Sequence, residues 1–78
     1  MILRPEDAHF LDCTGLACPM PIVRLSQAMR ALLPGETLVI EASDPAFRPD
    51  LEAWLRRFGH TLLSFEEGPV LRARVLKK

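Results

Sequence analysis

The sequence has 78 residues, of which 49% are hydrophobic, 26% charged and 6% aromatic. This length and balance predict a single globular domain over residues 1–78 with a mostly aliphatic core, and they argue against disorder. Ten basic and ten acidic side chains cancel, so no overall charge attracts nucleic acid or an anionic membrane. No apolar run approaches the roughly 20 residues of a membrane helix. Two cysteines without a signal-like N-terminal segment favour the cytoplasm over a secreted, disulfide-linked domain.

The N-terminal part of the chain predicts an arm, a strand and a tight turn. Residues 1–8 have no apolar periodicity, so we expect a loosely held arm. Residues 9–13 predict a short strand that ends at Thr14 and Gly15. Gly15 permits the positive φ that a sharp strand-to-helix turn needs, and Leu16 can pack back to close the turn.

The next segments predict a helix and a central strand. Residues 19–33 carry apolar side chains at helical spacing, namely Ile22, Leu25, Met29, Leu32 and Leu33. Such a stripe is typical of a helix that buries one side. Pro34 and Gly35 then stop the helix. The compact apolar run within 36–42 is typical of a central strand that is buried on both faces or nearly so.

A second helix is predicted to begin at Pro49. Its apolar stripe has the spacing i, i+3, i+4 and i+7 and consists of Leu51, Trp54, Leu55 and Phe58. Gly59 suits the left-handed position after a helix end. We therefore expect Trp54 to be a core residue. Asp44 and Asp50, before and within the first turn, are expected to cap this helix.

The C-terminal part of the chain predicts a hairpin over 60–66 and 70–77, turning at 67–69. The first three strands are joined through helices, so we expect them to run parallel, with the fourth antiparallel to the third. Two helices with single stripes cover one face of a sheet, which leaves Arg72 and Arg74 on the other. The predicted fold class is α+β, a two-layer βαβαββ sandwich with a four-stranded mixed sheet and two helices on one face.

Cys18 stands where the first helix is predicted to begin. Pro19 suits the first helical position, because its missing N–H would be unpaired there, and Pro21 still falls in the first turn. Cys18 would then be the N-cap, where free N–H groups and the helix dipole lower the pKa of a thiol and favour its reactive thiolate. A small buried cysteine under the sheet fits the same position. Position alone does not decide between these interpretations.

The residues around Cys18 resemble a known family. Cys18-Pro19-Met20-Pro21, preceded by Gly15-Leu16, resembles the Cys-Pro-x-Pro motif of the TusA (SirA-like) sulfur-carrier family. The resemblance extends over 11–77 through three further landmarks in the same order: Pro34-Gly35-Glu36, Asp44-Pro45-Ala46 followed by Asp50, and Gly59-His60. It also implies that the Asp44 edge lies near the cysteine loop.

The family resemblance implies a persulfide carrier with the βαβαββ fold. Sulfur would be held on Cys18, with Gly15, Leu16, Pro19 and Pro21 as supporting motif residues and no cofactor beyond the transient persulfide. The implied partners are a cysteine desulfurase or rhodanese-like donor and a downstream acceptor protein. We expect the chain to be a monomer and to act as a carrier rather than as a stand-alone enzyme. The family serves tRNA thiolation, molybdenum-cofactor assembly and sulfur oxidation, and the sequence does not choose among these pathways.

Cys13 leaves two functional alternatives open. We favour a packing role, because a cysteine at a strand end is usually buried. As a resolving thiol it would instead attack a Cys18 persulfide and make the protein a redox regulator. A metal site formed by both cysteines with His9 and His60 has no supporting spacing, so no metal is predicted. A nucleic-acid-binding module is a further alternative, because a similar fold occurs in a translation initiation factor, but the balanced charge argues against it.

Overall fold

The computed structural model describes residues 9–78, so the predicted arm over 1–8 lies outside the described residues. The elements follow the predicted βαβαββ order. They are β1 (Phe10–Cys13), α2 (Met20–Arg30), β2 (Thr37–Ala42), α3 (Phe47–Phe58), β3 (Thr61–Glu66) and β4 (Leu71–Leu76). Neither helix of this described part has the length and apolar character that crossing a membrane requires.

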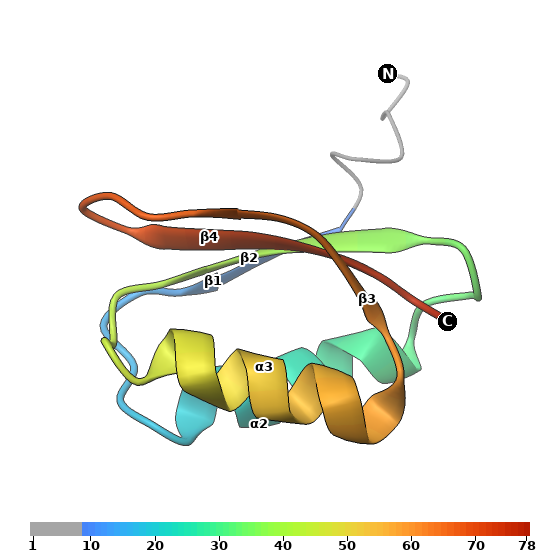
Figure 1. The fold of residues 1–78 in the computed structure, drawn as a ribbon, viewed down its shortest axis with the longest axis horizontal. Coiled ribbons are helices and arrows are strands. Elements are labelled where there is room, and N and C mark those ends of the chain that lie inside the picture. Colours follow the sequence, from blue (N-terminus) through green and yellow to red (C-terminus); the bar gives the residue numbers. More distant parts are fainter. Residues whose placement is uncertain (1–8) are drawn as a thin grey trace.

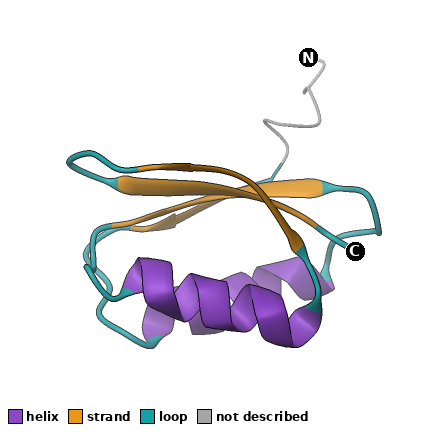
Figure 2. Ribbon diagram, viewed as in Figure 1, coloured by secondary structure: helices purple, strands orange, loops and turns teal. Residues whose placement is uncertain are grey.

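The four strands form one mixed sheet in the order β1-β2-β4-β3. β1 pairs in parallel with β2, whereas β4 is antiparallel to both of its neighbours. The first three strands therefore run in one direction and the last two form a hairpin, as predicted. Both helices lie on the same side of the sheet (Figure 1; Figure 2). The predicted two-layer α+β sandwich is confirmed.

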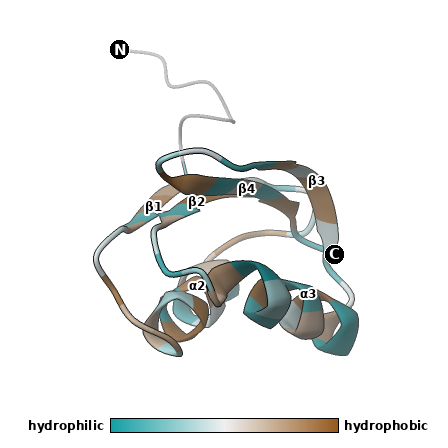
Figure 3. Ribbon diagram, turned by 60° about the vertical axis from the view of Figure 1, so that its left-hand side comes forward, coloured by the Kyte–Doolittle hydropathy of each residue, from teal (hydrophilic) through white to brown (hydrophobic). Residues whose placement is uncertain are grey.

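The hydrophobic core lies between the sheet and the helical layer. β2 contributes Leu38, Ile40 and Ala42 to this core, and β4 contributes Ala73 and Val75. The helices complete it with Leu25, Met29, Phe47, Leu51, Trp54 and Leu55. Both helices carry hydrophilic residues as well as hydrophobic ones along their length (Figure 3), which is the pattern of helices buried on one side.

The opposite face of the sheet is open and carries charged side chains. Arg72 lies directly across from Glu41 in the register of β4 with β2, and its Nε donates to Glu41 Oε2 at 2.8 Å. Arg74 alternates with the buried residues Ala73 and Val75, as the sequence predicts for this face. The sheet therefore buries one face. The loop that carries Cys18 joins β1 to α2, so it lies at an end of the sandwich rather than on the open face.

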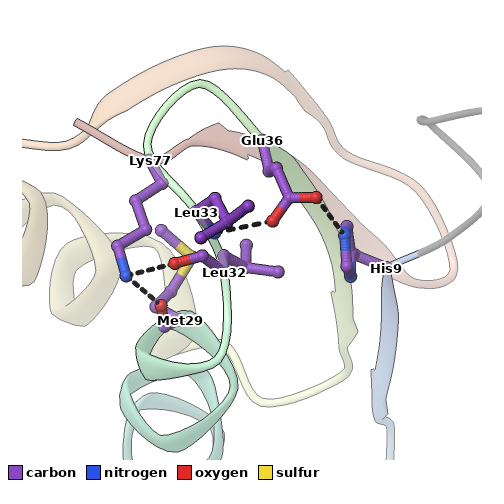
Figure 4. Close-up of polar contacts among 6 residues, drawn as sticks. All are labelled: His9, Met29, Leu32, Leu33, Glu36 and Lys77. Carbon is purple, nitrogen blue, oxygen red and sulfur yellow. Dashed lines mark hydrogen bonds and ion pairs between the residues drawn. The ribbon is translucent and has the colours of Figure 1, made fainter.

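The first helix is shorter than predicted. α2 ends at Arg30, and Lys77 Nζ donates to the carbonyl oxygens of Met29 and Leu32 at 2.7 and 2.6 Å (Figure 4). A cationic side chain satisfies carbonyl groups that a helix end leaves unpaired. Leu33 is 68% exposed, so its assignment to the buried stripe is wrong, because the chain leaves the helix before it.

The second helix begins earlier than predicted. α3 starts at Phe47 rather than Pro49, and the side chain of Phe47 is buried in the core. Pro49 is tolerated because the N–H groups of the first turn have no intrahelical partner. Asp44 shapes this start from outside the helix: its carbonyl oxygen accepts the Phe47 N–H at 3.0 Å. The predicted left-handed Gly59 at the helix end is confirmed, with φ of 77°.

Glu36 joins the α2–β2 turn to the start of the sheet. Its Oε1 accepts a hydrogen bond from the backbone N–H of Leu33 at 2.6 Å, and its Oε2 lies 3.3 Å from Nε2 of His9 (Figure 4). The Leu33 bond, followed by the contact with His9, lowers the pKa of the Glu36 carboxyl.

Glu36→Gln should reduce the amount by which the free energy of unfolding falls in acid. Because the pKa of Glu36 is lower in the folded chain than the roughly 4.3 of a free glutamate, the ionised carboxylate stabilises the fold above that pH. This contribution is lost as the pH falls through the folded value. Denaturant unfolding from about pH 6 to about pH 3 should show a smaller loss in the variant. Equal losses in the two proteins would contradict this assignment.

Candidate functional site

The loop between β1 and α2 begins with a tight turn. The Leu16 N–H donates to the carbonyl oxygen of Cys13 at 3.2 Å, and Gly15 has φ of 82°. Glycine is the residue that adopts this conformation without strain. Leu16 packs against the core, and the Gly15 N–H donates to Ser43 Oγ at 2.8 Å. The predicted positive φ of Gly15 and the inward packing of Leu16 are confirmed, and the turn is also tied to the loop after β2.

Gly15→Ala should destabilise the fold by about 1 kcal/mol through backbone strain alone. Among residues 9–78 a Cβ at this position would meet no atom within 4 Å, so we attribute the cost to the left-handed φ. Gly68→Ala is the matched control, because its Cβ would meet only the carbonyl oxygen of Val70 at 3.9 Å and its φ lies outside the left-handed region. Denaturant unfolding measures both variants. Equal free energies of unfolding of the two variants would show that a side chain at position 15 causes no backbone strain.

Cys18 is exposed and lies one residue before the helix N-cap. α2 begins at Met20 with Pro19 as its N-cap, and the Cys18–Pro19 peptide bond is cis. The prediction that Cys18 is the N-cap is therefore wrong, because the carbonyl of Pro19 is the one that accepts the first N–H groups of the helix. Pro21 falls in the first turn, as predicted, and its missing N–H costs no hydrogen bond there.

Two carboxylates meet Cys18 from other segments of the chain. The Cys18 backbone N–H donates to Asp44 Oδ2 at 2.5 Å, and its Sγ donates to Asp50 Oδ2 at 2.8 Å. Asp44 follows β2 and is itself held by the Ala46 N–H, which donates to its Oδ1 at 3.1 Å. Asp50 lies in the first turn of α3. The sulfur is therefore positioned by the loop after β2 and by α3 as well as by its own loop.

These contacts raise the pKa of the Cys18 thiol above its ordinary value. The hydrogen bond to Asp50 is the largest cause, followed by burial and by the charges of Asp50 and Asp44. The expected lowering of this pKa at a helix N-terminus is therefore wrong, because the hydrogen bond to Asp50 and the negative charges of Asp50 and Asp44 disfavour the thiolate. These contacts favour the thiol form of Cys18 relative to the thiolate.

No local pattern in the sequence predicted that Asp44 and Asp50 contact Cys18. The family resemblance implied only that the Asp44 edge lies near the cysteine loop. The sequence predicted that both residues cap α3, yet the structure shows no side-chain cap on that helix. The predicted parallel direction of the first two strands was a usable signal, and the structure adds that these strands are neighbours. β1 and β2 run parallel and adjacent, and the carboxyl ends of parallel strands meet at one edge of a sheet. The loops that follow these two strands are therefore neighbours.

The remaining candidate residues lie apart from the Cys18 thiol or in the core. Cys13 is fully buried in the hydrophobic core, and burial is the main cause that raises the pKa of its thiol. His9 pairs with Glu36, while the ring of His60 packs on Trp54 with the centroids 5.1 Å apart. Among residues 9–78 no group of three or more metal-ligating side chains is assembled. Burial of Cys13 is what the packing interpretation requires, and it removes that thiol from solvent.

An open groove of about 300 Å³ lies between α2 and α3. Pro19 and Asp50 line it at the cysteine end. The rest of the lining consists of Ile22, Ala53, Trp54, Arg57 and Phe58. Most of these residues are apolar, and the groove reaches Cys18 through its neighbour Pro19 and its hydrogen-bond partner Asp50.

The fold and the site define a small two-layer α+β protein with one buried and one accessible thiol. Residues 9–77 match the family described as Sulfurtransferase TusA. The match covers nearly all of the described residues, and the chain belongs to the TusA family.

Relatives of known sequence agree with this assignment. The Bacillus subtilis (strain 168) protein named "Putative sulfur carrier protein YrkI" is 46% identical over 68 residues, which cover 86% of this chain and 91% of the relative. The protein named "Putative sulfur carrier protein YrkF", also from Bacillus subtilis, is 51% identical over 63 residues, which cover 80% of this chain but 34% of the relative. The chain thus spans about a third of the length of YrkF.

A solved structure confirms the fold. The crystal structure of a SirA-like protein from Desulfitobacterium hafniense superposes with a TM-score of 0.74, covering 86% of this chain and 93% of the other. The two sequences are 18% identical, so the likeness concerns the fold alone. It places the βαβαββ sandwich among known SirA-like architectures.

Proposed function

We propose that this chain is a sulfur carrier that accepts a sulfur atom on Cys18 as a persulfide and passes it to an acceptor protein. The observation that carries the proposal is the exposed Cys18 thiol at the start of α2 in a member of the TusA family. Relatives named as sulfur carriers support it. A carrier needs a thiol that a partner protein can reach, and Cys18 meets this need while Cys13 does not.

The transfer conserves atoms and electrons without a further oxidant. The Cys18 sulfur attacks the outer sulfur of a donor persulfide, and its electron pair forms the new S–S bond. The S–S bond of the donor breaks, and its electron pair goes to the donor cysteine. The proton that leaves the Cys18 thiol ends on that donor thiol. In delivery, a nucleophile of the acceptor attacks the outer sulfur of the Cys18 persulfide. The S–S bond breaks, and its electron pair returns to the Cys18 sulfur, which regains a proton.

The partners follow from this chemistry. The donor is a protein that forms a cysteine persulfide, such as a cysteine desulfurase or a rhodanese-like protein, and the acceptor presents a nucleophile to the outer sulfur of the Cys18 persulfide. The chain carries no resident cofactor in this scheme, because the transferred sulfur itself is the cargo. We expect the carrier to act as a monomer in the cytoplasm, since each transfer needs one accessible thiol in a reducing compartment.

Intact-mass measurement tests the proposal. The purified chain is incubated with a cysteine desulfurase and cysteine, and separately with a rhodanese and thiosulfate. At least one donor should add one sulfur atom per chain, and a thiol reductant should remove it. If both donors form their own persulfides and neither changes the mass of this chain, the proposed function is wrong.

A further inference from the structure

The Cys18 thiol donates a hydrogen bond to a carboxylate. The Sγ–Oδ2 distance to Asp50 is 2.8 Å, and the backbone N–H of the same cysteine binds Asp44. Asp50 is only partly exposed, at the groove between α2 and α3. A reactive cysteine is commonly paired with a cation or with a neutral base such as histidine, and both favour the thiolate. Here the hydrogen-bond partner of the sulfur is an anionic carboxylate, whose charge favours the protonated sulfur.

Building on the proposed function, we propose that Asp50 restrains the sulfur-free carrier by holding Cys18 as a protonated and slowly reacting thiol. The thiolate is the reactive form of cysteine. An acceptor that binds the S–H proton, and whose negative charge lies beside the sulfur, disfavours that form. Asp50 is thus a positioning residue that protects the empty carrier from oxidants and small electrophiles, which react with any accessible thiolate.

The restraint applies to the empty carrier and ends when sulfur is loaded. In a Cys18 persulfide the inner sulfur is bonded to carbon and to the outer sulfur, so it has no proton to donate to Asp50. The outer sulfur is bonded to the inner one at about 2.05 Å and is a separate atom from the one that donates to Asp50. Asp50 therefore interacts with the empty and the loaded carrier in different ways, and it restrains only the empty one.

The charged surroundings of the sulfur agree with this role. Within the described part of the chain, the charged groups that raise the pKa of the Cys18 thiol are carboxylates, Asp50 from α3 and Asp44 from the loop after β2. Arg57 lines the same groove farther along α3. Glu52, two residues beyond Asp50, pairs with Arg48 at 3.8 Å instead. Glu52 thus offers a matched control for a change of charge on the same helix.

The test is the pH dependence of alkylation of Cys18 by iodoacetamide in the wild type, Asp50→Asn and Glu52→Gln. Asp50→Asn should lower the midpoint of the pH–rate curve. At neutral pH its rate should rise roughly threefold for each unit by which the midpoint falls, because the gain in thiolate exceeds the loss in its intrinsic nucleophilicity. Glu52→Gln should follow the wild-type curve. An Asp50→Asn midpoint equal to or above that of the wild type would overturn the proposal.

Sulfur loading of the same three proteins separates this inference from the proposed function. If the wild type gains sulfur while the Asp50→Asn curve does not move, the restraint is wrong and the carrier function stands. If the Asp50→Asn curve moves but no protein gains sulfur from either donor, the carrier function is wrong, although Asp50 still restrains the Cys18 thiol. Circular dichroism of each variant confirms that it is folded before either measurement.

Discussion

Cys18→Ser should fold like the wild type and take up no sulfur from any donor. Serine keeps an O–H that can donate to Asp50, and the exposed position imposes no packing demand. The hydroxyl oxygen, however, does not attack the outer sulfur of a persulfide under conditions in which a thiol does. Intact mass after incubation with the two donors should therefore show the unmodified chain, whereas thermal unfolding should resemble that of the wild type.

Cys13→Ala is the control for this experiment. Its thiol is fully buried, so its removal should leave sulfur loading in place while slightly lowering stability. Loading of Cys18→Ser at the wild-type level would mean that another residue carries the sulfur. A folded Cys13→Ala variant that fails to load would instead support the alternative in which both cysteines take part in thiol chemistry.

Trp54→Ala should lower the free energy of unfolding by about 3–5 kcal/mol. Trp54 is 7% exposed, and its Nε1–H donates to Ser26 Oγ at 2.8 Å, which ties α3 to α2. Its ring also packs against Phe58 and His60, with centroids 5.7 and 5.1 Å apart. The truncation removes these contacts together and leaves a cavity. A domain of this size has a total stability of only about 5–15 kcal/mol, so the variant should lie close to unfolding.

Phe58→Ala is the matched control, because Phe58 is an aromatic residue of the same helix that is 52% exposed. Its truncation loses less buried area and should cost clearly less. Urea unfolding followed by circular dichroism compares the two variants. Equal midpoints of Trp54→Ala and Phe58→Ala would show that Trp54 does not hold the helices together.

The parts of the fold that follow from local periodicity were predictable. The i, i+3, i+4 and i+7 stripe of α3 places Leu51, Trp54 and Leu55 in the core because helical spacing alone puts them on one side. Gly15 and Gly59 were predictable as left-handed residues because each follows the end of an element. Strand order was not predictable, since the sequence does not say that β4 lies between β2 and β3.

The chemistry of the candidate site depends on contacts between distant segments. Cys18 binds Asp44 and Asp50, which are 26 and 32 residues away in the sequence. A local pattern assigned the cysteine to a helix cap and therefore gave the wrong direction for its pKa. Leu33 and Phe47 show the same limit, because the fold rather than the stripe decides where each helix ends or begins. The position of the thiol was predictable, but the direction of its pKa shift was not.

Locating the transferred sulfur within the chain tests the central claim most directly. After loading, the persulfide is capped with an alkylating reagent and the protein is digested. No lysine or arginine lies between Cys13 and Cys18, so both thiols stay in one tryptic peptide, and fragment ions must separate them. We predict that the additional sulfur is found on Cys18 and that Cys13 stays an unmodified thiol. A loaded chain with the sulfur on Cys13, or with a disulfide between the two cysteines in place of a persulfide, would contradict the account.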